Sequence, residues 1–217
     1  MRRGMFALWV LCLGTARVAS ADPVTLTSGT VFVYGAASSG FGQGSFDVSG
    51  TGFAANGFGT AIAPAVGTFN VGSLNLSGMM NVNPSDALDN GTVTTGGQLL
   101  AGFPSASVQV IAEPFVVPDA PQGDSETFHT SFTARGLVQL FAHLGDSNPI
   151  FSQEVSGRGT MSIEGENIGG GQFLTGGVGL TFSPADTGSP PPEPASLLLL
   201  GTGLAAVWQS RRVRQAS

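Results

Sequence analysis

The sequence predicts an all-β protein, built around a single glycine-rich antiparallel β-sandwich. Glycine accounts for 33 of the 217 residues, and residues that favour helices are scarce outside the two ends of the chain. Phenylalanine and valine recur between the glycines, as expected for short strands that bury one face. The central region of roughly 160 residues is long enough for one domain with a substantial core and too short for two.

Strand-like runs bounded by turn residues recur along this central region. They lie at residues 30–34, 45–49, 69–80, 93–100, 105–111, 127–134, 137–144, 150–156, 160–164 and 178–182. We expect Asn56-Gly57 and Asn90-Gly91 to close tight hairpins, because such dipeptides readily adopt the left-handed conformation that these turns require. Residues 117–126, which contain two prolines, are expected to form the clearest loop.

An internal echo bears on how the strands are arranged. Residues 29–33 resemble residues 136–140, and residues 48–52 resemble residues 155–159, so that each second copy follows its first by 107 residues. A chance match between glycine-rich strands is the alternative. If the similarity is real, the two copies could occupy equivalent places in two packed sheets, which favours a β-sandwich over a closed barrel.

The N-terminal end has the pattern of a secretory signal peptide. Two arginines precede the apolar residues 5–13, and Ala19 and Ala21 supply a small-x-small cleavage site. We therefore expect a signal peptide over residues 1–21. The only cysteine, Cys12, lies inside it, so the mature chain would contain no disulfide and would depend on its core for stability.

Three features follow one another at the C-terminal end: an acid between two prolines, an apolar stretch and a basic cluster. They are Pro192, Glu193 and Pro194; residues 195–208; and Arg211, Arg212 and Arg214. As a helix, the apolar stretch would reach only about 22 Å, against a hydrocarbon core of roughly 30 Å. It would be a marginal anchor, and the arginines would keep its end in the cytoplasm with the domain on the far side.

This order of features resembles the PEP-CTERM sorting signal of Gram-negative bacteria, which exosortases process. The prolines and the acid match the tripeptide of that signal, and Ser196, Leu197, Leu200, Gly201, Gly203 and Leu204 match its small-and-leucine helix. The resemblance implies that the export machinery and an exosortase are partners. It also implies transient anchoring, cleavage near the tripeptide, and delivery to the cell surface or the extracellular matrix. An ordinary membrane anchor is the alternative.

Four segments are therefore expected: a signal peptide at 1–21, a β-domain at 22–183, a proline-rich spacer at 184–194 and a sorting tail at 195–217. All 14 acidic residues lie between residues 22 and 193, together with only two basic residues, Arg135 and Arg158, which gives this region a net charge of −12. Such a surface repels phosphate backbones, so we expect no nucleic-acid partner.

The two histidines are the first candidates for a metal site. If residues 127–144 form a hairpin that turns at Gly136, His129 lies directly across from His143 on the polar face. Two neutral imidazoles can bind a metal. A solvated cross-strand pair is the alternative, because two ligands by themselves do not complete a metal site.

Two acidic clusters are the other candidates. Asp86 and Asp89 precede Gly91, and Glu164 and Glu166 precede Gly169, which places oxygen ligands near expected turns. Calcium takes six to eight such oxygens, but neither spacing matches a known calcium loop. A structural calcium and ordinary polar turns both fit; we otherwise expect no cofactor.

Catalytic patterns are scarce, so we expect no enzymatic activity. The chain has no Gly-x-Ser-x-Gly elbow, and its mature part has no cysteine nucleophile. Three functions are considered: a structural or surface protein, a polysaccharide- or calcium-binding module, and a hydrolase that uses dispersed carboxylates. Exposure of Phe41, Phe53 or Phe58 would favour polysaccharide binding, because sugar sites usually stack aromatic rings.

Overall fold

The computed structural model describes residues 22–34, 42–64, 67–119 and 123–184, and these residues form twelve strands and no helix. The strands are β1 (Val24–Tyr34), β2 (Gly42–Gly50), β3 (Phe53–Ile62), β4 (Thr68–Asn70), β5 (Gly72–Leu74), β6 (Ser77–Asn83), β7 (Gly91–Thr95), β8 (Gln98–Ala112), β9 (Phe115–Val117), β10 (Ser125–Phe141), β11 (Phe151–Gly169) and β12 (Gln172–Ser183). The all-β prediction is therefore confirmed for this part of the chain. No helical membrane span occurs within it. The predicted signal peptide and C-terminal transmembrane helix lie outside the described residues.

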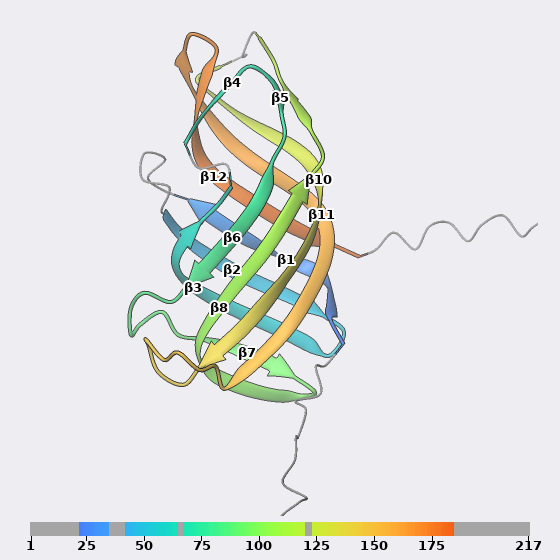
Figure 1. Ribbon diagram of the computed structural model, residues 1–217, viewed down its shortest axis with the longest axis vertical. Coiled ribbons are helices and arrows are strands. Elements are labelled where there is room, and N and C mark those ends of the chain that lie inside the picture. Colours follow the sequence, from blue (N-terminus) through green and yellow to red (C-terminus); the bar gives the residue numbers. More distant parts are fainter. Residues whose placement is uncertain (1–21, 35–41, 65–66, 120–122, 185–217) are drawn as a thin grey trace, which may run out of the picture.

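The strands make two sandwich-like layers that cross one another (Figure 1). Strands β6, β8, β10 and β11 run through the front layer, and β1, β2 and β3 run behind them. The layers are nevertheless parts of one sheet, because β1 pairs with β2 on one side and with β12 on the other. Two separate packed sheets were expected, and instead the large sheet folds over and closes on itself. Among the described strands, only β5 and β9 form a separate pair.

The internal echo corresponds to two equivalent strand pairs. Gly29 of β1 lies opposite Val48 of β2, and Gly136 of β10 lies opposite Val155 of β11. The second pair is displaced from the first by the same 107 residues in both strands, so the two pairs share one register. Figure 1 places β1 and β2 in the rear layer and β10 and β11 in the front layer. The sequence similarity is thus matched by a similarity in strand pairing.

A continuous apolar core fills the space between the layers, because alternate residues of each strand point inward. At one end of the core, four phenyl rings from β4, β9, β10 and β12 pack together. They are Phe69, Phe115, Phe128 and Phe173, with ring centroids 5.4 to 5.9 Å apart in each contacting pair. Phe173 is fully buried. Such aromatic contacts add to the stabilisation that apolar burial provides.

Two glycines that were expected to lie in turns lie inside strands. Asn56-Gly57 lies inside β3 instead of closing a hairpin, and β10 passes through Gly136 without turning. A side-chain carbon at Gly136 would overlap the carbonyl oxygen of Ser107 on β8. The glycine therefore permits a close approach of two strands, and the predicted hairpin over residues 127–144 is wrong. The strands predicted at 150–156 and 160–164 likewise join into β11.

The opposite error occurs where a predicted strand contains a real turn. Residues 93–100 were expected to be one strand, but Gly96 and Gly97 have φ angles of +54° and +80° and close the hairpin between β7 and β8. The strand predicted at 69–80 is divided into β4, β5 and β6, and Gly72, where β5 begins, has a φ angle of +116°. Asn90 ends a longer loop that joins β6 to β7, so it does not close a tight turn either.

Candidate functional site

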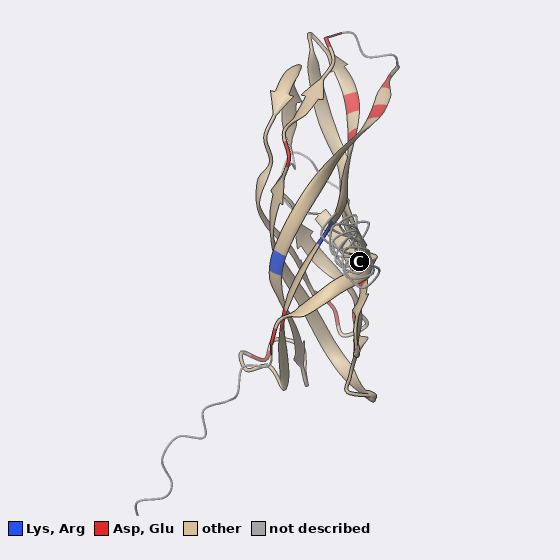
Figure 2. Cartoon of the chain, turned by 90° about the vertical axis from the view of Figure 1, so that its right-hand side faces the viewer, with Lys and Arg blue, Asp and Glu red and all other residues tan. Residues whose placement is uncertain are grey.

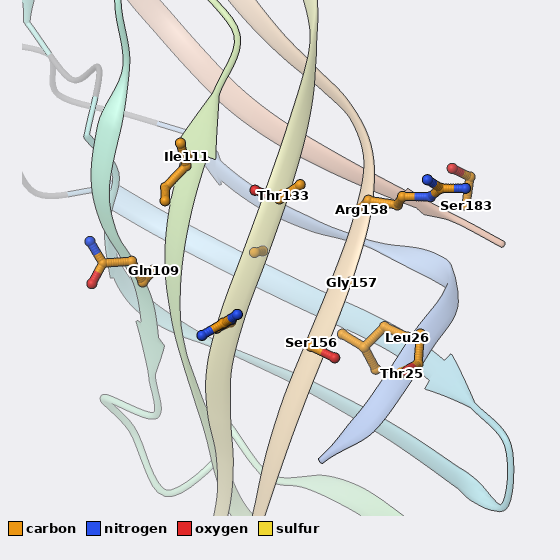
Figure 3. A pocket seen from close by; sticks show the side chains of 11 residues that line it. Thr25, Leu26, Gln109, Ile111, Thr133, Ser156, Gly157, Arg158 and Ser183 are labelled. Atoms are coloured by element: carbon orange, nitrogen blue, oxygen red, sulfur yellow. The ribbon is translucent and has the colours of Figure 1, made fainter. Parts of the chain in front are cut away.

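The outward-facing side chains of β8, β10 and β11 line a shallow groove beside the start of β1 and the end of β12 (Figure 3). Its volume is about 610 Å³. A second depression of about 540 Å³ adjoins it and shares Ile111, Thr133, Arg158 and Ser183. The two depressions therefore form one elongated surface feature, which we call the arginine groove.

Strand pairing fixes the first row of side chains across this groove. Thr133 of β10 lies between Ile111 of β8 and Arg158 of β11, and Arg158 lies opposite Ser183 of β12. In Figure 3 the Arg158 side chain extends toward Ser183. The row thus places an exposed aliphatic side chain, two hydroxyls and one guanidinium group across four neighbouring strands.

A second row lies one pleat further along the same face. Arg135 of β10 lies between Gln109 of β8 and Ser156 of β11, and Ser156 pairs in turn with Thr25 of β1. Because Ser156 and Arg158 are two residues apart on β11, Arg135 and Arg158 are diagonal neighbours, with Cα atoms roughly 7–8 Å apart. Their long side chains can therefore act on one ligand.

The charge distribution distinguishes this groove from the rest of the domain. Arg135 and Arg158 are the only arginine or lysine residues between residues 22 and 193, and among the residues that the structure describes no acid lines the larger depression. Glu113 lines the smaller one, and Glu154 lies on β11 two residues before Ser156. Figure 2 shows the two basic positions near the middle of the molecule, with most acidic positions toward its ends.

The residue types in the groove suit recognition of an anion that also carries hydroxyl groups. A guanidinium group can donate two parallel hydrogen bonds to one carboxylate, and such charge-assisted bonds are stronger than neutral ones. Threonine and serine hydroxyls and the Gln109 amide can both donate and accept. Ile111 is 59% exposed and offers an apolar surface beside them.

The two histidines do not form the predicted pair. His129 lies on β10 opposite Ser162 of β11, whereas His143 lies in the loop after β10. The strand from His129 to Phe141 alone is about 40 Å long. The Nδ1 atom of His143 is instead 3.4 Å from Oδ2 of Asp146, which also accepts a 2.9 Å hydrogen bond from the His143 backbone N–H. The imidazoles are therefore too far apart to share a metal.

The carboxylates of Asp86 and Asp89 hold the loop between β6 and β7. Oδ2 of Asp89 accepts hydrogen bonds from the Ser85 N–H at 3.0 Å, the Ser85 hydroxyl at 2.9 Å and the Asp86 N–H at 2.7 Å. Oδ1 of Asp86 accepts one from the Leu88 N–H at 3.0 Å. Desolvation acts to raise the pKa of Asp89, but the bonds from Ser85 and Asp86 outweigh it and lower this pKa below its usual value.

Other predicted ligands have similarly local surroundings. Glu164 and Glu166 both point outward from β11, and the Asn167 side chain accepts a 3.0 Å hydrogen bond from the Gly169 N–H at the end of that strand. Within the described ranges, no group of three or more His, Cys, Asp or Glu residues is placed to hold a metal ion. Calcium binding accordingly stays a prediction.

The phenylalanines proposed as a sugar platform are only partly available. Phe53 is buried at 4% exposure, so this candidate is wrong, whereas Phe58 is 37% exposed. Phe41 lies outside the described residues. The cleavage residues Ala19 and Ala21 and the sorting residues of the C-terminal end also lie outside them.

Comparison with protein-family models identifies the end of the chain. Residues 192–213 match the PEP-CTERM protein-sorting motif. The chain carries a PEP-CTERM sorting motif at this end. The match covers Pro192, Glu193, Pro194, Arg211 and Arg212, and it indicates an exported protein that an exosortase sorts to the cell surface. A search of curated proteins and a search of solved structures each gave no match.

The sequence shows that Arg135 and Arg158 are the only arginine or lysine residues of the domain, but it does not by itself show that they are neighbours in the fold. The signal was present, because each arginine occupies an outward position in an alternating strand pattern. The predicted turn at Gly136 concealed it. Only the continuous pairing of β10 with β11 places the two guanidinium groups on one face.

Proposed function

We propose that this PEP-CTERM protein is a structural component of the cell surface or the extracellular matrix, without catalytic activity. In this proposal the β-domain is the part displayed outside the cell, and the C-terminal end is the sorting signal that directs it there. The order of domain, spacer and sorting motif carries the proposal. Eight residues, 184 to 191, separate the end of β12 from the matched motif, so sorting would act on the chain just beyond the domain.

Membrane anchoring in this proposal is transient. The apolar residues 195–208 halt in the membrane, with the arginines that follow on the cytoplasmic side. The exosortase then removes this tail near residues 192–194, and the domain is released or transferred. The large closed sheet and its continuous core suit a domain that must persist outside the cell without disulfides.

Fractionation of cells that produce the full-length chain tests the proposal. We expect the unaltered protein at the cell surface or in the matrix, shortened at its C-terminal end. Deletion of residues 192–213 should leave the domain in the periplasm, whereas deletion of spacer residues 185–190 should preserve sorting because the motif is intact. Identical distribution of all three proteins would refute the proposed role of the motif.

Polysaccharide binding is the second candidate function, and the arginine groove is the observation that favours it. A calcium-binding module and a hydrolase with dispersed carboxylates remain predictions from the sequence. Incubation of the protein with matrix polysaccharide distinguishes these alternatives. Retention without new reducing ends supports a binding module, release of reducing ends supports a hydrolase, and retention that requires added calcium supports the calcium-binding alternative.

A further inference from the structure

We propose that the arginine groove binds a carboxylate-bearing polysaccharide, with Arg135 and Arg158 as the residues that recognise its acidic groups. The inference rests on the proposed function in one respect, namely that sorting delivers the domain to a place where such polymers occur. The groove itself is defined by strand pairing. It requires neither the sorting tail nor cleavage of that tail.

The charge distribution of the domain supports a role for these two arginines in ligand binding. Fourteen acids and two arginines lie between residues 22 and 193. Both nevertheless occupy diagonal positions on neighbouring strands, at the wall of the depression of about 610 Å³. Clustering of the sole cations creates a local positive field within a negative surface, which complements an anionic ligand.

The spacing of the two side chains selects an anion of low charge density. Double-stranded DNA carries one charge per 1.7 Å of its axis, and the net charge of −12 on the domain would repel it strongly. A polysaccharide with one carboxylate per sugar presents fewer charges over the same length. Two guanidinium groups whose Cα atoms are roughly 7–8 Å apart can each engage a separate carboxylate along such a polymer.

The remaining residues of the groove fit the neutral parts of a sugar chain. Gln109, Thr133 and Ser156 can exchange hydrogen bonds with hydroxyl groups, and Ile111 can cover the apolar face of a ring. The groove continues into the smaller depression, where Ser131 and Thr160 add further hydroxyls. Its elongated outline can therefore accommodate more than one sugar of a chain.

Two carboxylates of the described residues lie close to the arginines and limit the positive field. Glu113 bounds it at one end and Glu154 at the other, both on the same outer face as the arginines. In the part of the chain that the structure describes, no histidine lines either depression. Binding should therefore follow the ionisation of the ligand carboxylates. It should be strong at neutral pH and weaken as the pH falls toward the carboxylate pKa, near 4.

Affinity electrophoresis of the full-length chain in mild detergent tests the inference, with polygalacturonate as the probe. The methyl-esterified form of the same polymer is the matched control, because it removes the charge and keeps the sugar backbone. We expect retardation by polygalacturonate only, with retardation that decreases as salt is raised. Retardation by both polymers, or by neither, would overturn the proposed recognition of carboxylates.

Substitutions locate the site. Arg135→Gln should weaken binding roughly tenfold, as expected for loss of one charge-assisted pair, and the Arg135→Gln/Arg158→Gln variant should abolish it. Gln109→Lys adds a third cation beside Arg135 and should tighten binding. Gly176→Ala, which alters the exposed face of β12 away from the groove, is the control and should bind like the unaltered chain. Far-ultraviolet circular dichroism checks that each variant is folded.

Two competing ligands complete the test. Single-stranded DNA and vesicles that contain anionic phospholipid both present phosphates, and we expect each to bind more weakly than polygalacturonate. Stronger binding of either one, with the same dependence on Arg135, would replace the polysaccharide with a phosphate-bearing partner. Failure of polygalacturonate binding leaves the fractionation result intact, so the ligand and the sorting role can be refuted separately.

Discussion

Gly136 of β10 lies opposite Val155 of β11, within the antiparallel pairing that joins these two strands. On its other side, Gly136 lies opposite Val108 of β8. A side-chain carbon at this glycine would overlap the Ser107 carbonyl oxygen and would come within 2.9 Å of the Val108 Cα atom. The three strands can approach closely at this point because the residue on the middle strand, Gly136, has no side chain.

This contact predicts that Gly136→Ala is destabilising. The added methyl group meets backbone on β8, which cannot move without disturbing the sheet, so we expect a loss of about 2 kcal/mol or more in the free energy of unfolding. Urea denaturation of the purified protein measures it. Gly176→Ala is the matched control, because its nearest neighbour would lie at 3.9 Å on Glu164. Equal stability of the two variants would contradict the proposed backbone contact.

The phenylalanine cluster predicts a large cost for Phe173→Ala. This ring is fully buried and contacts both Phe69 and Phe128, so its removal leaves a cavity at one end of the core. We expect a loss of about 3–5 kcal/mol in the free energy of unfolding. Phe58→Ala, at a ring that is 37% exposed, should cost about 1 kcal/mol or less. Thermal unfolding of both variants ranks the two sites, and a reversed order would contradict the assigned core.

The hydrogen bonds in the loop between β6 and β7 predict that Asp89 makes a pH-dependent contribution to the free energy of unfolding. Its three hydrogen bonds favour the charged carboxylate and lower its pKa below the usual 3.8, so the stabilisation is complete above that value. It is lost as the pH falls through the lower pKa of the folded state. Asp89→Ala should therefore reduce stability by about 1 kcal/mol at pH 7 and progressively less in acid.

Denaturation curves at several pH values check this difference. Asp119→Ala is a suitable control, because Asp119 is exposed and lies in a different loop. The control should be neutral throughout the range. A cost for Asp89→Ala that does not diminish below about pH 3 would show that the carboxylate charge is not responsible.

The basic cluster after the apolar stretch predicts a sorting defect. Replacement of Arg211, Arg212 and Arg214 by glutamine should let the tail slip through the membrane unprocessed, because the positive charges would no longer hold its end in the cytoplasm. Mass spectrometry of the secreted chain measures the C-terminal end. Replacement of the same residues by lysine keeps the charge and should preserve processing. Unchanged export and trimming in the glutamine variant would remove this role from the arginines.

Several strands could be predicted because their residues alternate in polarity over a short window. Residues 30–34, 45–49 and 178–182 were identified in this way and lie within β1, β2 and β12. Strand β3 was missed because it contains small residues and the Asn56-Gly57 dipeptide, which favours a turn when read locally. Its pairing with β2 and β7 overrides that preference.

The arginine groove likewise could not be predicted from short windows of sequence. Arg135 and Arg158 are 23 positions apart in the sequence, and their proximity follows from the register in which Arg135 faces Ser156. A register is set by the hydrophobic pattern of two whole strands, and an error of one turn changes every partner. The predicted pairing of His129 with His143 failed for this reason.

The sequence by itself determined the sorting address, the acidity of the domain and its all-β class, because each depends on composition or on a contiguous run of residues. Only the tertiary structure decided that β1 pairs with β12 to close the sheet, and that the two arginines share a groove. These features depend on pairings between segments that are distant in the chain. They are selected by the burial of a common core, which no short window of sequence contains.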